Sequence, residues 1–206
     1  MSGILFIISS PSGGGKGTLI KEVLRTMPRI GYSVSYTTRK MREGEFHGRD
    51  YFFVSVEQFD ELREKGEFLE YAEVHGNFYG TSVNQIKTEN EKGNDIILEI
   101  DTQGAESVKT KMPEAVGIFI MPPTYEVLKN RLTNRATENE QSLTLRLKNA
   151  SDEVRHFSEF EYVVINDDKT VAAEELKAII TAERRKQIRQ TAKITAIINT
   201  FDFIDK

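Results

Sequence analysis

Cysteine is absent from the 206 residues, so the chain can form neither a disulfide bond nor a metal site with thiolate ligands. This absence fits a reducing compartment, and we expect a cytoplasmic protein. Histidine is also scarce. His47, His75 and His156 do not have the spacing of a metal site.

Long hydrophobic runs and a large excess of one charge are missing as well. The apolar stretch 4–8 has five residues and no basic flank, which is too short for a signal peptide or a membrane span. With 28 basic and 32 acidic residues the formal net charge is −4, which argues against broad nucleic-acid binding. We therefore expect neither a membrane nor a nucleic-acid partner. The length suits one domain, or one core that carries small inserted lobes.

What the chain does have is a glycine-rich segment, SSPSGGGKGT at 9–18, between an apolar run and a helical pattern. A strand, a glycine loop with one lysine and a helix form the layout of a phosphate-binding P-loop. Backbone N–H groups and the helix N-terminus attract phosphates, and Lys16 reaches the outer ones. The usual pattern has glycine where Ser10 stands and a hydroxyl where Gly17 stands, so Thr18 comes one place late. The alternative is a flexible Gly/Ser linker. The position of the segment between a buried-type strand and an amphipathic helix argues against a linker.

Strands that alternate with helices predict an α/β fold with a parallel sheet and right-handed crossovers. Strands are expected at 4–8, 32–36, 51–54, 68–74, 95–101, 116–121 and 162–165, and a turn at 76–77 leads into the run 78–81. Helices are expected at 16–27, 56–65, 125–132, 142–157 and 171–190. Residues 34–83 are expected to form a β-rich insert, and the segment after Gln190 is not assigned.

A second basic segment, SYTTRKMR at 35–42, places Arg39 and Arg42 in a loop among hydroxyl groups. One arginine guanidinium can bind two phosphate oxygens at once. This loop is therefore a candidate second phosphate site. A solvated basic loop is the alternative, and these residues alone do not decide between the two.

Two carboxylates form a third signal: Glu70 in the insert, and Asp101 at the end of an aliphatic strand. A carboxylate can accept both the N1–H and the exocyclic amine of guanine. Adenine has an acceptor at N1 and would leave that carboxylate unpaired. From its spacing alone, Glu70 is expected to be a surface charge.

The motifs SSPSGGGKGT, SYTTRKMREGE, GRDYFF, FLEYAEVHGNFYGT, ILEIDTQG and VINDD occur in the order seen in guanylate kinases. The resemblance extends to about residue 185. It implies a P-loop kinase core (1–33, 84–125 and 155–206), a mixed β-rich GMP-binding insert (34–83) and a helical lid (126–154). The implied reaction is ATP + GMP to ADP + GDP with Mg²⁺, a step of purine nucleotide metabolism.

The resemblance also implies roles for single residues. The ATP site would be formed by Ser12, Gly13, Gly14, Gly15, Lys16, Gly17, Thr18 and Asn166. The GMP site would be formed by Ser35, Arg39, Arg42, Tyr51, Glu70, Tyr79, Thr81 and Asp101. The catalytic cations would be Lys16, Arg39, Arg131, Arg135 and Arg146. Whether Mg²⁺ is held by Thr18, by Asp101 through water, or by the phosphates stays open.

Two other functions remain as alternatives. One is a kinase for another nucleoside monophosphate, which the residue that reads the base would distinguish. The other is a non-catalytic guanylate-kinase-like module. Such a module keeps the fold, lacks the P-loop lysine or the loop residues around it, and binds proteins. Lys16, Arg39 and Arg42 are all present, which favours an enzyme. The sequence does not decide between a monomer and a homodimer.

Overall fold

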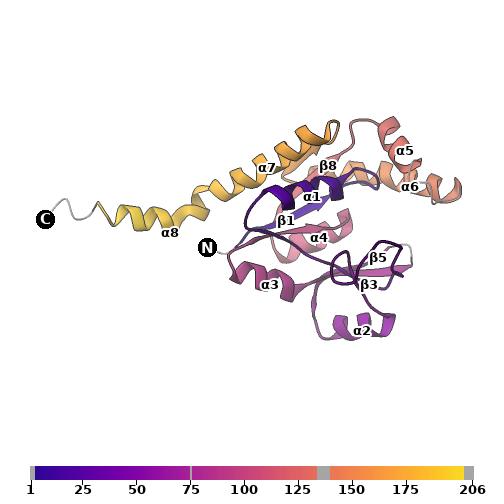
Figure 1. Cartoon of the computed structure of the whole chain (residues 1–206), viewed down its shortest axis with the longest axis horizontal. Coiled ribbons are helices and arrows are strands. Elements are labelled where there is room, and N and C mark those ends of the chain that lie inside the picture. Colours follow the sequence, from indigo (N-terminus) through magenta and orange to yellow (C-terminus); the bar gives the residue numbers. More distant parts are fainter. Residues whose placement is uncertain (1–2, 75, 134–139, 202–206) are drawn as a thin grey trace.

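The structure is a computed structural model and describes residues 3–74, 76–133 and 140–201. Its centre is a parallel sheet of five strands in the order β2-β7-β1-β8-β9 (Figure 1). The predicted α/β class, with a parallel sheet flanked by helices, is confirmed. The strands are β1 (Leu5–Ser9), β2 (Ile30–Tyr32), β7 (Asp95–Glu99), β8 (Val116–Met121) and β9 (Tyr162–Ile165).

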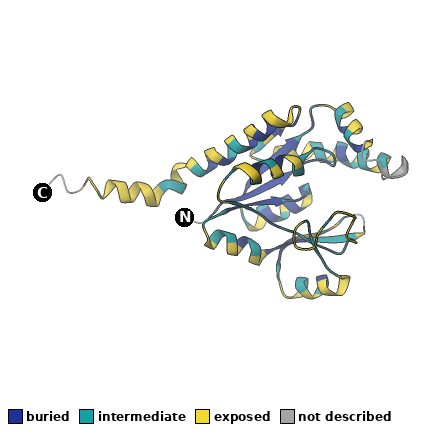
Figure 2. Cartoon of the chain, in the orientation of Figure 1, coloured by how far each residue is buried: buried dark blue, intermediate teal, exposed yellow. Residues whose placement is uncertain are grey.

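The central strand β1 is buried on both faces, as its continuous apolar run predicts (Figure 2). Phe6 and Ile8 contribute to one core cluster, with side chains of α1 (Lys16–Thr26) and α7 (Lys169–Arg185). Leu5 and Ile7 contribute to the other, with side chains of α3 (Val83–Glu91) and α4 (Thr102–Lys111). Successive side chains of a strand point to opposite faces, so five residues anchor both helical layers.

A second, mixed sheet has the order β4-β3-β6-β5. Its strands are β3 (Tyr36–Thr37), β4 (Phe52–Phe53), β5 (Phe68–Val74) and β6 (Asn77–Ser82). Helix α2 (Val56–Glu64) begins with a capping box between Ser55 and Gln58, and its buried Phe59 stacks on Phe68 with ring centroids 4.6 Å apart. This aromatic packing gives the small sheet a core of its own.

The strand expected at 32–36 is wrong, because the chain changes sheets within it. Ile30–Tyr32 pairs with β7 in the large sheet, whereas Tyr36–Thr37 pairs with β4 and β6 in the small one. Between them Ser33 is buried, and its N–H donates to the carbonyl of Ile97 at 3.0 Å. Apolar alternation continues through this crossing, so the sequence pattern does not reveal it.

The C-terminal helical segments differ from expectation in their ends. The helix expected at 171–190 is two helices, α7 and α8 (Gln187–Ile198), because Lys186 leaves the helical conformation with ψ 134°. The unassigned tail is therefore helical up to Ile198, and α8 extends away from the body without buried residues (Figures 1 and 2).

Near the P-loop lie α5 (Tyr125–Thr133) and α6 (Glu140–Glu153), and a 3₁₀ turn (Val154–Glu159) follows α6. Among the described helices, none combines the length and apolar character that a membrane span needs.

Asp95, at the start of β7, joins several segments that are distant in sequence. Its Oδ1 accepts the N–H of Ile4 at 2.8 Å, and its Oδ2 accepts Nε of Arg184 at 2.6 Å. Arg184 also donates to the carbonyls of Pro28 and Arg29, at 3.0 Å each. Asp95 is only 6% exposed, so removing it leaves a guanidinium and an amide without their partner.

We predict that Asp95→Ala lowers the free energy of unfolding by about 3 kcal/mol, because a partly buried charge loses its partner. Denaturant unfolding measures this loss. The exposed Asp167 is the matched control, and Asp167→Ala should change stability by less than about 0.5 kcal/mol. Equal effects of the two variants would contradict the role given to Asp95.

Candidate active site

The glycine loop after β1 is shaped by positive backbone angles and by two side chains from elsewhere in the chain. Gly15 has φ +92°, and a Cβ there would lie 2.3 Å from Nδ2 of Asn166. Asn166, just after β9, donates to the carbonyl of Gly14 at 2.8 Å. Arg131 of α5 donates to that carbonyl at 3.4 Å and to the carbonyl of Asn166 at 2.9 Å. The loop is thus fixed through its own carbonyl, and α1 begins immediately at Lys16.

Lys16 faces the carboxylate of Glu99, with Nζ 3.8 Å from Oε1. Gly17 lies against the same carboxylate, because a Cβ on Gly17 would be 3.5 Å from Oε1. Thr18, one place later, is exposed. The position that lacks the usual hydroxyl therefore faces an acidic side chain at the end of β7.

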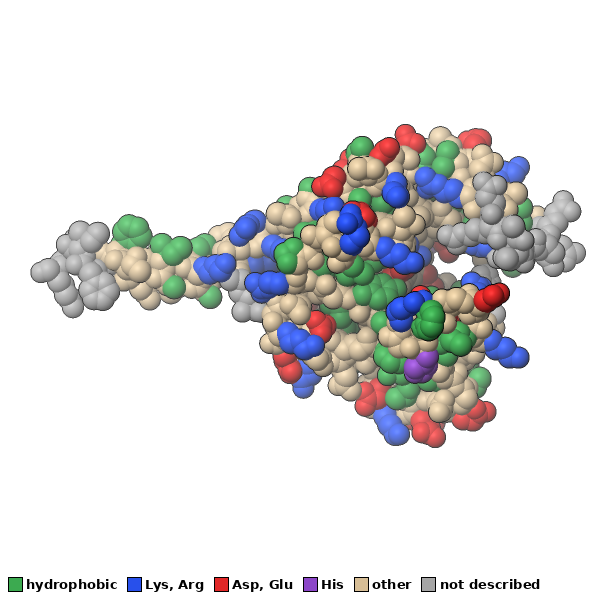
Figure 3. All heavy atoms as spheres, viewed as in Figure 1, with side chains coloured by type: hydrophobic (Ala, Val, Ile, Leu, Met, Phe, Trp, Pro, Cys, Tyr) green, Lys and Arg blue, Asp and Glu red, His purple; other side chains and the backbone are tan. Residues whose placement is uncertain are grey.

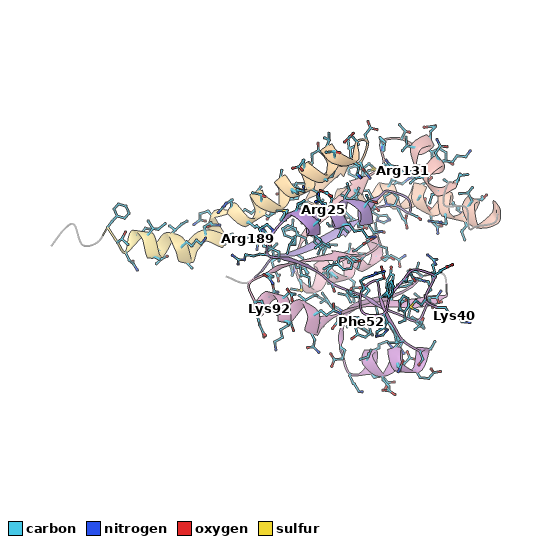
Figure 4. The ribbon with its side chains drawn as sticks, viewed as in Figure 1. Arg25, Lys40, Phe52, Lys92, Arg131 and Arg189 are labelled. Carbon is cyan, nitrogen blue, oxygen red and sulfur yellow. The ribbon has the colours of Figure 1, made fainter. Side chains whose placement is uncertain are left out.

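Helix α6 touches the P-loop through Ser12. Arg146 donates to Oγ of Ser12 from Nε at 3.2 Å and from Nη2 at 2.8 Å, and the N–H of Ser12 donates to Glu153 at 2.9 Å. Glu153 was missed by the sequence analysis, although it follows Arg146 by two helical turns and lies on the same face. Arg135 lies outside the described residues. Figure 4 shows Arg131 on α5 and Lys40 in the segment between β3 and β4. Basic side chains therefore come from both of these segments.

In the segment between β3 and β4, Arg39 is held in place by an acid and an aromatic ring. Its guanidinium donates to both oxygens of Glu45, at 3.0 and 2.8 Å, and lies 5.3 Å from the ring centre of Tyr51. The hydrogen bonds from Arg39 lower the pKa of Glu45, so this acid stays ionised. Arg42 is exposed, and its N–H donates to Glu45 at 2.8 Å. Glu45 therefore organises the basic loop, which its sequence position did not indicate.

Two tyrosines predicted for the GMP site lie together beside this loop. The ring centroids of Tyr51 and Tyr79 are 5.9 Å apart in an edge-on arrangement. Burial raises the pKa of the Tyr51 hydroxyl, so it stays protonated and can donate to an anion. Ser35 is half-buried just before β3, and its carbonyl accepts the N–H of Phe52 at 2.9 Å.

Glu70 is 5% exposed, so the expectation of a surface charge is wrong. It lies opposite Thr81 across β5 and β6, and the Thr81 hydroxyl donates to it. Asp101 caps α4 by accepting the N–H of Gly104 at 2.8 Å. A Cβ on Gly104 would be 3.2 Å from Glu70 and 3.3 Å from Asp101, so this glycine marks the meeting of the two carboxylates. Burial raises the pKa of Glu70, and the charge of Asp101 raises it further.

A cavity of about 480 Å³ lies between the small sheet, β2 and α3. Its lining includes Tyr32, Tyr36, Phe52 and Gln85, and none of the predicted nucleotide-binding residues lines it. Figure 3 shows a separate hollow above the small sheet, with Lys and Arg side chains beside it. The candidate site therefore rests on the contacts above and not on this cavity.

A glycine loop at the end of a central parallel strand, a helix starting at its lysine and arginines from the neighbouring segments define a P-loop kinase fold. The family model for guanylate kinase matches residues 2–183. The chain belongs to the guanylate kinase family.

Individual relatives agree with this assignment. A guanylate kinase of Vibrio cholerae is 49% identical over 199 residues, covering 96% of each chain. One of Aromatoleum aromaticum is 46% identical over 206 residues, covering all of both chains. The crystal structure of guanylate kinase from Anaplasma phagocytophilum is 37% identical, with a TM-score of 0.75, and the match covers 91% of this chain and 89% of that one.

We predict that Gly15→Ala lowers kcat/KM for ATP about 100-fold, because its Cβ displaces Asn166 and disfavours the left-handed backbone. Gly17→Ala is the comparison. Its Cβ meets Glu99 at ordinary contact distance, so the loss should stay below about tenfold. Steady-state kinetics with varied ATP measure both. A larger loss for Gly17→Ala would contradict this description of the loop.

Proposed function

We propose that this chain binds ATP on the glycine loop and GMP at the small sheet and transfers the γ-phosphoryl group of ATP to GMP, giving ADP and GDP. The observation that carries the proposal is the buried Glu70, placed against Thr81 and Asp101 on the insert side of a P-loop. A buried carboxylate needs hydrogen-bond donors, and guanine offers two adjacent ones. Ser35, Thr81 and Asp101 would complete the guanine site.

The phosphate of GMP would lie on Arg39, Arg42, Tyr51 and Tyr79. Arg39 already binds Glu45 through two hydrogen bonds, so an arriving phosphate must share or replace that partner. The acceptor oxygen of the GMP phosphate is ionised near neutral pH, so the transfer needs no general base. Catalysis then depends on position and on charge neutralisation.

The phosphates of ATP would lie on the loop 12–18, with Asn166 supporting the loop from beneath. Lys16, Arg39, Arg131, Arg135 and Arg146 would supply the positive charge around the transferring group. Arg131 is oriented by two carbonyls and Arg146 by Ser12, which keeps both near the loop before ATP arrives. Preorganised cations stabilise the transition state because they need not reorient during the reaction.

Magnesium fits this site as an ion carried mainly by the phosphates. Within the described ranges, no group of three His, Asp or Glu side chains is placed to hold a metal. Mg²⁺ commonly uses one or two carboxylates together with substrate phosphates and water. We propose contacts from Thr18, or from Asp101 through water. When bound, the ion would neutralise charge between the β- and γ-phosphates.

The same proposal assigns the segments. The GMP-binding insert would comprise 34–83 and the lid 126–154, with the core formed by 1–33, 84–125 and 155–206. Closure of insert and lid over the nucleotides would exclude water that otherwise hydrolyses ATP. We propose that the partners of the chain are the small molecules GMP and ATP and that the protein is located in the cytoplasm.

The proposal is tested by initial rates with ATP and each of GMP, AMP, CMP and UMP in a coupled ADP assay. GMP should be the preferred acceptor by orders of magnitude, because of these four bases only guanine offers two adjacent donors to an ionised Glu70. Comparable rates with another monophosphate would overturn the base assignment. A folded protein without turnover on any of them would favour the non-catalytic module.

Glu70→Gln separates recognition from stability. We predict about a 100-fold higher KM for GMP, because the amide presents a donor to a guanine donor, while KM for ATP changes little. The free protein should become more stable at neutral pH. The folded-state pKa of Glu70 is raised, so stability falls as pH rises from the unfolded pKa, and the amide removes that loss.

Thermal unfolding and GMP kinetics measure these two effects, with Glu73→Gln as the control. Glu73 lies on the same strand and is exposed, so its change should move neither quantity. Equal effects on ATP and GMP, or destabilisation by Glu70→Gln at neutral pH, would contradict the assignment.

Lys16→Ala should lower kcat by about a thousandfold, because the outer phosphates of ATP lose a point charge. GMP affinity, measured by calorimetry, should stay nearly unchanged because its phosphate lies on the insert. A loss of GMP affinity instead would show that the two phosphate sites are exchanged.

A further inference from the structure

We propose that Tyr32 is a positioning residue for phosphoryl transfer: its hydroxyl holds Glu99 away from Lys16, which leaves the lysine available to ATP. The inference rests on the proposed function, and it concerns a residue that the sequence analysis did not single out. Tyr32 ends β2 at the edge of the core sheet, and its ring packs against the core cluster. The same residue lines the cavity between the small sheet, β2 and α3.

The strand register brings Tyr32 and Glu99 together. Tyr32 pairs with Ile97 in β7, and Glu99 follows two residues later on the same face. Diagonal neighbours of this kind are within reach of an aromatic side chain. The Tyr32 hydroxyl donates to Oε2 of Glu99 at 3.1 Å. In the described part of the chain, no other side chain donates a hydrogen bond to Glu99.

The other oxygen of Glu99 faces the P-loop. Oε1 is 3.8 Å from Nζ of Lys16, whereas a direct charge-assisted hydrogen bond is about 2.7–2.9 Å long. Gly17 offers no side chain that could hold Oε1 in place, because its Cα faces that oxygen with only a hydrogen. The carboxylate therefore attracts the lysine without binding it closely, and the hydrogen bond from Tyr32 maintains this separation.

The hydrogen bond from Tyr32 to Glu99 is stable to changes in pH. Burial raises the pKa of the Tyr32 hydroxyl far above its usual value, and the negative charge of Glu99 raises it further. The hydroxyl thus remains a donor throughout the range in which a kinase works. Without it, Glu99 gains rotamer freedom and can close on Lys16 as a direct ion pair. That ion pair would compete with the phosphates of ATP for the lysine.

The test is a double-mutant cycle of Tyr32→Phe, Glu99→Gln and the double variant, with kcat and both KM values measured for each. Tyr32→Phe should lower kcat/KM for ATP about tenfold, and KM for GMP should stay within about twofold. In the Glu99→Gln background the same change should have no further effect, because the neutral amide does not capture Lys16.

A matched control separates positioning from simple loss of a hydrogen bond. Tyr162 donates to Oε1 of Glu183 at 2.6 Å, and this pair lies on β9 and α7 away from the site. Tyr162→Phe should lower the thermal midpoint at least as much as Tyr32→Phe and leave the kinetics unchanged. The unfolding curves also confirm that each variant is folded.

Several outcomes would overturn the inference. One is Tyr32→Phe kinetics equal to those of the wild type or of Tyr162→Phe. Another is a loss of the same size in the Glu99→Gln background, which would mean that Tyr32 does not act through Glu99. If the wild-type protein itself fails to phosphorylate GMP, the proposed function fails and this inference fails with it. An active wild type with an unaffected Tyr32→Phe variant rejects the inference alone.

Discussion

Glu70 brings a carboxylate from β5 into a setting where only 5% of the residue is exposed. Burial opposes its charge, and the neighbouring Asp101 opposes it further, while the hydroxyl of Thr81 offsets part of this penalty. The group is placed by strand β5 of the small sheet, by the close approach of α4 at Gly104 and by the cross-strand Thr81. Under the proposed function, a ligand with two adjacent donors would relieve this penalty, and Glu70 would then be the basis of selectivity for guanine.

The cationic groups of the site follow a related rule. Arg39 is bound by Glu45, Lys16 faces Glu99, and the loop residue Ser12 connects Arg146 with Glu153. Glu45 orients Arg39 through two hydrogen bonds and Ser12 orients Arg146, which limits the freedom that ligand binding must remove. The acids also prevent a cluster of positive charges from repelling itself. Under the proposed function, phosphates would compete with Glu45 for Arg39 and with Glu99 for Lys16.

The sequence alone allowed prediction of the α/β class, the position of the P-loop and the segment that forms the second sheet, because these depend on local pattern and on contiguous motifs. The resemblance also selected Asn166 and Arg131, which the structure brings to the loop carbonyl of Gly14. The supporting residues Tyr32, Glu45 and Glu153 were not found. Their roles arise from strand register and from contacts distant in sequence, which no single motif encodes. The sheet change after Tyr32 was missed for the same reason.

The central claim, that Glu70 is costly to ionise until guanine binds, is tested by proton release on GMP binding. Titration calorimetry at mildly acidic pH, in buffers of different ionisation enthalpy, counts the protons released. The phosphate of GMP titrates equally in the wild type and in Glu70→Gln, so it cancels in the difference. The raised pKa of Glu70 predicts that the wild type releases more protons than the variant. Equal proton release by the two proteins would contradict the account.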